Sequence, residues 1–537
     1  MATSRKAPAA LLTVALCAAA AGCTPAAPGP SLDEPPRAAA QDLGVALVGQ
    51  DPFLRGTPPA PNLGPLSSGP DPGIFETLVR LTPGFGIAPG LALRWEAVSP
   101  ALWRFQLRDG VRFHNGAALD AAAAVAMLDA VAARQTHPRG LEPGSARAAS
   151  AHVVEVALSA PNLRLPEQLA NPSMGIQAPG TRAGAGADPA STPTGTGPFR
   201  FGSYTPGARL VVHANPDYWG RPPALRSITF RFVVDEQQAA RLLAAGEVDA
   251  VGHLSPATAA GAQGHAPGRL AASQPARTVY LLLNVGGVGR WASLQDDRLR
   301  RAVALAVDRA ALTTALWPDH GEPNRTLIPP AVLGDAAGAV RPPEHDPDRA
   351  GRLLDEAGWP RGPDGVRLRD GRRLILSLLL GRPAEQAGVA EVLARQLETV
   401  GIGVELLDPG PEPFAAFGRV NQATFDLFVD TRAQEDANPC ALCRFFSIRP
   451  GGQLTFSGAV GAGEAADELF EDAHTVASLD SAQRLAAELM QVVTADRVVA
   501  VPLATLPAVW LLSPRVQAFE PAALGGDQHW DQVWLGG

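Results

Sequence analysis

The sequence predicts an α/β protein of two or three lobes, on three grounds. Its 537 residues exceed the size of an ordinary single domain. Hydrophobic residues make up 46% of the chain and charged residues 18%, which is typical of globular proteins with well-filled cores. Apolar strand-like runs such as Ile228 to Val234 and Thr278 to Asn284 alternate with helical patterns such as Glu236 to Ala245 and Arg298 to Leu316, an order that favours α/β lobes.

Turn and capping residues place further elements along the chain. Asp109-Gly110 separates the apolar runs Leu102 to Leu107 and Val111 to Phe113, which predicts a β-hairpin because both turn residues tolerate positive φ. Leu119 to Ala133 is alanine-rich and is expected to be helical. The other expected elements are strands at 199–201, 209–213 and 403–406, and helices at 346–357 and 389–400, the last capped by Gly401.

The N-terminus is typical of an export signal. Arg5 and Lys6 precede the apolar run Leu11 to Ala21, which is too short to cross a bilayer as a mature helix. The run ends in Ala20-Ala21-Gly22-Cys23, an order of small residues before a cysteine that matches a bacterial lipobox. We expect residues 1–22 to be removed and Cys23 to be acylated; the alternative is an ordinary signal peptide in which the cysteine occurs by chance.

Residues 23–40 predict a Pro- and Ala-rich tether that holds the folded body away from a membrane. No later run is long and apolar enough to span a bilayer. We therefore expect a lipid-anchored protein on the extracytoplasmic face of the cell membrane.

Composition and missing motifs exclude several functions. A net charge of −8 and a pI near 5.7 disfavour nucleic-acid binding. Lys6 is the only lysine, so a phosphate-binding loop and a catalytic lysine are excluded from the mature chain. There is no Gly-x-Ser-x-Gly and no His-Glu-x-x-His, and we expect neither enzyme activity nor a cofactor or metal. A secreted hydrolase with two converging carboxylates remains an alternative.

Six short motifs occur in a fixed order between residues 70 and 360. They are Leu107 to Gly116, Gly195 to Phe199, Asn215 to Gly220, Gly246 to Asp249, Arg300 to Arg309 and Asp346 to Gly358. As an ordered set they resemble family 5 of the bacterial extracellular solute-binding proteins, which serve peptide and nickel importers. Most of these motifs are explained by turns and packing; for example, we expect Tyr218 and Trp219 to pack beneath a turn.

The resemblance implies a periplasmic-binding-protein-like fold of class II, cluster C type. We expect lobe one to span 41–276 with an extra subdomain at about 75–190, lobe two to span 277–500, and residues 501–537 to return to lobe one, with a hinge near 277–280 and 499–501. The implied function is that of a monomeric solute-binding subunit that delivers cargo to the permease and ATPase of an ABC importer. A receptor domain that presents ligand to a sensor has the same fold and remains an alternative.

The same resemblance points to one ligand-contacting stretch. A family pattern, Trp-x-x-Asp-x-x-Asp-Pro, aligns with residues 432–439, where Arg432 replaces the tryptophan and Glu435 the first acid. We expect Glu435 to hold an ammonium group and Arg432 a carboxylate, with Asp436 taking the acid's role if the register slips by one. Aromatic support is expected from Trp510 or Tyr280.

The cargo implied by these residues is a small amphoteric solute such as a short peptide. Metal chelates, sugars and opines remain alternatives, and so does a solvated polar loop that contacts no ligand. Cys440 and Cys443 would be the only cysteines left after processing and acylation. Outside the cytoplasm a disulfide is favoured for them, while a redox pair or part of a zinc site are the alternatives.

Overall fold

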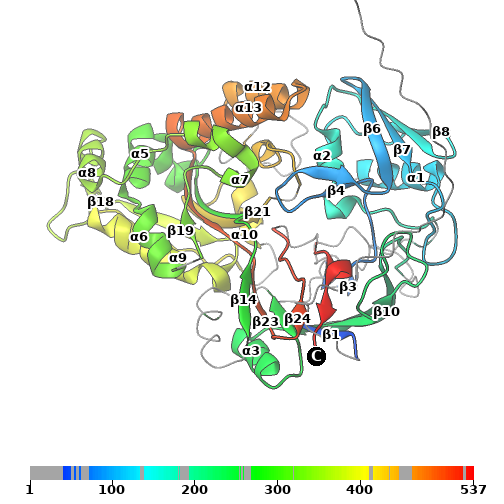
Figure 1. Ribbon diagram of the computed structural model, residues 1–537. Helices are drawn as coiled ribbons and strands as arrows, with labels where there is room; N and C mark the ends of the chain where they lie inside the picture. Colours follow the sequence, from blue (N-terminus) through cyan, green and yellow to red (C-terminus); the bar gives the residue numbers. More distant parts are fainter. Residues whose placement is uncertain are drawn as a thin grey trace, which may run out of the picture.

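The computed structural model describes residues 40–49, 54–55, 60–61, 72–133, 138–179, 181, 193–252, 254, 258, 268–318, 320–410, 415–434, 436–446, 462–523 and 528–537. Cys23, the tether and Glu435 lie outside these residues. Two large sheets and one smaller sheet organise the described part of the chain (Figure 1). Within it, no helix is long and apolar enough to cross a membrane.

The first large sheet has seven strands. In spatial order they are β10 (Phe199–Thr205), β11 (Arg209–Ala214), β12 (Ser227–Val233), β1 (Asp42–Val48), β13 (Ala250–Gly252), β23 (Val509–Leu512) and β14 (Arg269–Ala272). Helix α3 (Glu236–Ala244) begins after Asp235, whose side chain accepts a hydrogen bond from the Gln238 amide. The sheet buries a separate apolar cluster on each face.

The second large sheet has six strands and is covered by long helices. Its strands are β16 (Glu322–Pro323), β22 (Ala500–Leu506), β15 (Arg277–Leu283), β21 (Leu427–Ala433), β19 (Ile375–Leu380) and β20 (Gly403–Leu406). Helices α5 (Asp297–Ala306), α6 (Arg309–Leu316), α8 (Pro347–Glu356) and α9 (Pro383–Thr399) pack one apolar cluster against it (Figure 1). The remaining helices of this part are α7 (Pro330–Leu333), α10 (Ala415–Asn421), α12 (Glu464–Thr475) and α13 (Leu479–Gln491).

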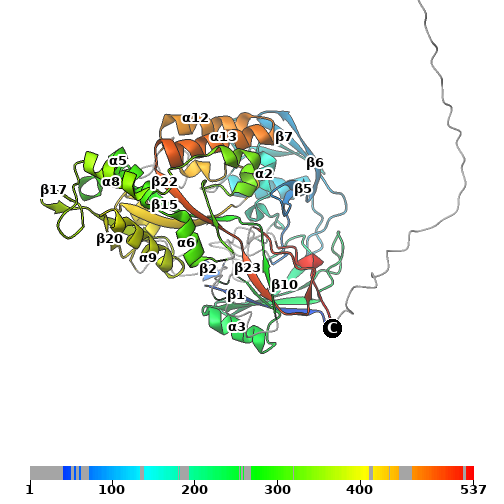
Figure 2. The ribbon, with the colours of Figure 1, turned by 60° about the vertical axis from the view of Figure 1, so that its left-hand side comes forward.

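The smaller sheet has four strands, β6 (Ala92–Ser99), β7 (Leu102–Leu107), β9 (Val153–Ala157) and β8 (Ala146–Ser150). It carries α1 (Ala121–Ala132) and α2 (Leu165–Leu169). Two-stranded pairs complete the fold: β2 (Leu54–Arg55) with β3 (Ala60–Pro61), β4 (Val79–Leu81) with β5 (Ile87–Pro89), β17 (Leu368–Arg369) with β18 (Arg372–Arg373), and β24 (Val516–Gln517) with β25 (Trp534–Leu535). From here on, the first lobe denotes the seven- and four-stranded sheets with their helices, and the second lobe the six-stranded sheet with its helices (Figures 1 and 2).

Two connections join the large sheets. Residues 273–276 lead from β14 to β15, and residues 507–508 lead from β22 to β23. They run side by side, because the Ser273 amide donates to the Ala508 carbonyl at 3.0 Å and the Ala276 amide to the Leu506 carbonyl at 3.1 Å. The chain therefore returns to the first sheet at β23 and not at residue 501, and the segments expected as a hinge, 277–280 and 499–501, lie within or beside strands of the second sheet.

Two local predictions are wrong. Leu102 to Leu107 is a strand, but it pairs with β6 and β9, and residues 111–113 form no strand with it; Gly110 still has φ +75°. The helix expected from Arg298 to Leu316 is two helices, since Val307 is extended (ψ 113°) and Asp308 caps α6 by accepting from the Ala311 amide at 2.9 Å. At Asp308 the side-chain cap outweighed the apolar pattern, and at β7 pairing with β6 and β9 took the place of the expected hairpin.

Glu76 draws two of the sequence motifs together. Its carboxylate accepts hydrogen bonds from Tyr218 Oη at 2.9 Å, Trp219 Nε1 at 2.8 Å and Thr196 Oγ1 at 2.8 Å. His114 of a third motif contacts the Gly197 carbonyl at 3.0 Å through Nε2. Burial raises the pKa of Glu76, while its three donors oppose that shift. These motifs thus attach the four-stranded sheet to the seven-stranded one.

Candidate functional site

A polar group lies in the middle of the second sheet, on strands β15 and β21. Antiparallel pairing sets Tyr280 opposite Asp430 and Thr278 opposite Arg432. Directly opposed residues share a face of the sheet, and so do residues two apart on one strand. All four side chains therefore project from the same face.

Tyr280, Asp430 and Arg432 form a hydrogen-bonded chain. Tyr280 Oη donates to Asp430 Oδ2 at 3.0 Å, and Arg432 Nε donates to the same oxygen at 2.8 Å. Asp430 is 1% exposed and Tyr280 is 3% exposed. A carboxylate at such burial requires these partners, because an unpaired buried charge costs several kcal/mol.

The electrostatics keep Arg432 charged. Burial disfavours its cationic form, but Tyr280 and Asp430 outweigh burial, and the pKa of Arg432 lies above its ordinary value. Burial, followed by the charge of Asp430, raises the pKa of Tyr280 well above its usual range. At neutral pH the group therefore holds a phenol and an arginine–carboxylate ion pair.

Two aromatic rings hold the Arg432 guanidinium from other segments. Its Cζ lies 4.3 Å from the ring centroid of Phe445 and 5.5 Å from that of Phe417. The Phe417 ring is itself fixed edge-on against Phe428, with centroids 5.6 Å apart. The Arg432 side chain retains 21% exposure, so it is a positioned cation that is not fully enclosed.

The loop after β21 is ordered by its own polar side chains. Gln434 Nε2 donates to the carbonyls of Asp436 at 2.9 Å and Asn438 at 2.8 Å, and Asp436 Oδ1 accepts from the Asn438 amide at 2.9 Å. A disulfide joins Cys440 to Cys443, whose Cα atoms are 4.9 Å apart. The carboxylate of Asp436 is buried and braces the loop, while Glu435 lies outside the described residues.

The structure does not bring Trp510 to this group. Trp510 is on β23 of the first sheet, 4% exposed, with ring centroids 5.0 Å from Phe519 and 5.9 Å from Trp530. Gly252, its partner in the adjacent strand, lies under the indole so closely that a Cβ there would approach ring carbons to 2.6 Å. Trp510 is therefore part of an aromatic core. Of the two expected aromatic residues, only Tyr280 contacts Asp430, the partner of Arg432.

Three polar residues of the group carried no family motif and were missed. Asp430 could have been found from its spacing, since Asp430 and Arg432 stand two apart in a strand whose other residues, except Thr431, are apolar. Thr278 and Thr505 lie opposite each other on β15 and β22, and their buried Oγ1 atoms have no hydrogen-bond partner in the described part of the chain. A row Thr505, Thr278, Arg432 thus crosses three neighbouring strands.

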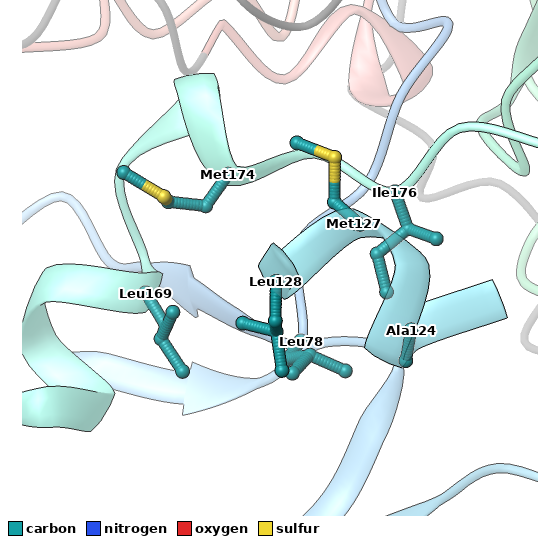
Figure 3. A pocket seen from close by; sticks show the side chains of 7 residues that line it. All are labelled: Leu78, Ala124, Met127, Leu128, Leu169, Met174 and Ile176. Atoms are coloured by element: carbon teal, nitrogen blue, oxygen red, sulfur yellow. The ribbon is translucent and has the colours of Figure 1, made fainter. Parts of the chain in front are cut away.

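A small apolar cavity lies elsewhere, in the four-stranded part of the first lobe (Figure 3). It has a volume of about 10 Å³ and is lined by Leu78, Ala124, Met127, Leu128, Leu169, Met174 and Ile176. Such a volume is close to the minimum that admits one water molecule, and the lining offers no polar side chain. The described residues also contain no group of three histidine, cysteine or acidic side chains that could hold a metal ion.

Comparison with known proteins identifies the family. The family model described as "Bacterial extracellular solute-binding proteins, family 5 Middle" matches residues 86–448. The chain belongs to this family. The resemblance recognised in the sequence is therefore confirmed, and residues 432–439, which we expected to contact the ligand, lie inside the matched region.

Curated relatives of the chain include proteins named for different solutes. It is 27% identical over 368 residues to a nickel-binding periplasmic protein of Escherichia coli, covering 66% of this chain and 69% of that protein. It is 30% identical to Protein XP55 of Streptomyces lividans (57% of this chain, 56% of that one) and 26% identical to di/tripeptide-binding protein 2 of Pseudomonas aeruginosa (62% and 66%). The match spans between about half and two thirds of these proteins' length.

Solved structures confirm the two-lobed fold. NikA from Brucella suis in complex with Fe(III)-EDTA superposes with a TM-score of 0.77 at 24% identity, covering 92% of this chain and 99% of that one. The oligopeptide-binding protein AppA from Bacillus subtilis, in complex with a nonapeptide, gives 0.73 at 19% identity (94% and 100%). The expected α/β architecture of a family 5 binding protein is thus present.

Proposed function

We propose that this family member captures a short peptide between its lobes and delivers it, unaltered, to the permease and ATPase of an ABC importer. The observation that carries the cargo assignment is the Arg432 guanidinium, which Asp430 and two aromatic rings hold in one place on the second sheet. A fixed arginine with apolar neighbours suits a peptide carboxylate, which it binds by charge-assisted hydrogen bonds. The di/tripeptide-binding relative and the nonapeptide-bound AppA support a peptide cargo.

The cargo's other end is assigned to the loop after β21. Glu435 follows the sheet by two residues and supplies an acid for a peptide ammonium. The hydroxyls of Thr278 and Thr505 are buried without partners among the described residues; Thr278 lies opposite Arg432, and Thr505 lies opposite Thr278 on the next strand. They offer further hydrogen bonds to the same carboxylate or to the peptide backbone.

The proposed anchoring and lobe boundaries follow from the export signal and the strand connections. Acylation of Cys23 would tie the mature chain to the membrane, with residues 24–40 as the tether. Lobe one would run from residue 41 to about 276 and resume at about 507, with lobe two between. No catalytic step is assigned, as expected of a family whose relatives are named as binding proteins.

Calorimetric titration with end-blocked peptides tests the cargo assignment. A di- or tripeptide should bind, its C-terminal amide should bind about ten- to a hundred-fold more weakly, and Arg432→Met should lose the same factor for the free acid only, since a hydrogen bond to a charged group contributes about 1.5–3 kcal/mol. Arg395→Met, at an exposed arginine on α9, is the control and should bind normally. Equal binding of the free acid and the amide by the wild-type chain would refute the role of Arg432.

A further inference from the structure

The two lobes touch at a second place, far along the chain from the strand connections. Helix α12 of the second lobe lies against residues 139–168 of the first lobe, and both views place α12 and α13 on the side of the four-stranded sheet (Figures 1 and 2). The Leu163 amide donates to the His474 carbonyl at 2.7 Å, Arg164 Nη2 donates to the Ala477 carbonyl at 2.7 Å, and Arg139 pairs with Glu471. These contacts involve no cargo.

His474 lies at the centre of this contact, 1% exposed. Its Nδ1 is 2.8 Å from the Phe470 carbonyl, which can only accept, so Nδ1 carries the proton. Its Nε2 lies 3.3 Å from Asn438 Nδ2 in its own lobe and 3.4 Å from Gln168 Nε2 in the other lobe. Both amide nitrogens are donors, so Nε2 accepts and the imidazole is neutral.

The orientations of both amides are fixed by further hydrogen bonds. Asn438 Oδ1 accepts from the Cys440 amide at 3.0 Å, and Gln168 Oε1 accepts from Asn162 Nδ2 at 2.7 Å. Neither amide can turn its oxygen toward His474 without breaking these bonds. A proton on Nε2 would therefore face two N–H donors, and both contacts would be lost.

The charges around the ring also oppose a second proton. Burial, with smaller contributions from the cations Arg139 and Arg164 of the first lobe, lowers the pKa of His474 to about 4, although the hydrogen bond to the Phe470 carbonyl opposes the shift. Those two arginines are paired with Glu471 and Glu167 respectively. The other charged residues of α12 are Glu464, Asp467, Glu468 and Asp472, and the loop after β21 carries Asp436 and Arg444.

We propose that His474 is a pH-sensitive latch between the lobes: the neutral imidazole holds them together through Gln168, and protonation at Nε2 releases them. Asn438 extends the latch to the loop that carries Glu435 and Asp436, so the lobe contact and the cargo-binding loop share one side chain. The inference depends on the two-lobed fold and not on the identity of the cargo.

Proton linkage sets the direction in which pH shifts the balance between open and closed chains. In an open form the exposed imidazole titrates near its ordinary value of about 6.5, whereas in the closed form it stays neutral down to about pH 4. Opening therefore takes up a proton between these values. The ratio of open to closed chains should rise by about tenfold for each pH unit lost in that window and stay constant above about pH 7.

The test measures the distance between the lobes without cargo. Paired spin labels at Ala148 on β8 and Arg352 on α8, both exposed, report that distance by pulsed electron resonance in the full mature chain at pH 7.5 and 4.5. We expect a longer population to appear at pH 4.5 while circular dichroism shows the chain folded. An unchanged distance distribution would overturn the proposal, whatever the outcome of the peptide titrations.

Three variants make the test specific. Gln168→Glu gives protonated Nε2 an acceptor and should keep the lobes closed at pH 4.5, while His474→Gln should remove the pH response. His114→Gln is the matched control and should respond like wild type, because burial likewise lowers the pKa of the half-buried His114 to about 4, but its ring Nε2 contacts the Gly197 carbonyl of its own lobe. A wild-type pH response in Gln168→Glu overturns the proposal even if His474→Gln fails to fold.

Discussion

The hydrogen-bonded group Tyr280–Asp430–Arg432, which contains the proposed cargo-binding cation, should also stabilise the second lobe. Asp430→Asn leaves one oxygen where Asp430 now accepts from Tyr280, from Arg432 and from the Thr431 amide, the last at 2.9 Å on Oδ1. The NH₂ group of the new side chain then faces either the Thr431 amide or both side-chain donors, depending on how the amide is turned. Removing one partner of a buried ion pair costs about 3–5 kcal/mol, and we expect a loss of unfolding free energy in that range.

A double-mutant cycle separates the interaction between Asp430 and Arg432 from the independent effect of each substitution on stability. Arg432→Met should also cost about 3–5 kcal/mol, since it leaves Asp430 charged and buried, but the double variant should lose about 1.5–3 kcal/mol less than the sum. Unfolding in guanidinium chloride gives these free energies. It is followed by both fluorescence and circular dichroism, because coincident transitions in the two signals show two-state unfolding. Asp480→Asn breaks the exposed Arg484–Asp480 pair on α13 and should cost at most about 1 kcal/mol. Additivity within about 0.5 kcal/mol would refute the coupling.

Two further predictions address the motif turn and the anchor. Gly197→Ala should destabilise the chain by at least about 1–3 kcal/mol in the same unfolding assay, because its Cβ would lie 2.3 Å from the Gly73 carbonyl oxygen. The control Gly84→Ala should be nearly neutral, because a Cβ there has nothing within 4 Å. Equal effects of the two substitutions would contradict this account of the motif. Wild-type cells grown with a clickable fatty acid should label the protein and Cys23→Ala should not; equal labelling would contradict acylation.

Elements with strong end signals were predictable from the sequence. Asp346 and Pro347 mark the start of α8, where Asp346 accepts from the Arg349 amide at 2.8 Å, and Gly401 ends α9 with φ +88°. The break at Asp308 was not predicted, because the apolar spacing continues across it and only the capping bond reveals it. The paired strand of β7 was misassigned, since a turn signal does not show which distant strand a run will join.

The site was predictable only in part. Arg432 was found through the family pattern, but Asp430, which orients it, has no motif and depends on strand alternation. Trp510 was chosen for its residue type, yet all residues of β23 are buried, and the indole completes a core. His474 could not be found at all, because its partners Gln168 and Asn438 are separated from it by 306 and 36 residues and meet only in the folded chain.

The most direct test of the proposed solute-binding function is a thermal-unfolding screen of the purified mature chain against a panel of small solutes. The panel should contain di- and tripeptides, opines, sugars and metal chelates, each over a range of concentrations. At least one class, and by our proposal the peptides, should raise the unfolding temperature saturably, equivalent to about 2.7 kcal/mol at 100 times the dissociation constant. If no class shifts the transition, the proposal that the chain captures a small solute is contradicted; if only another class does, the peptide assignment alone is.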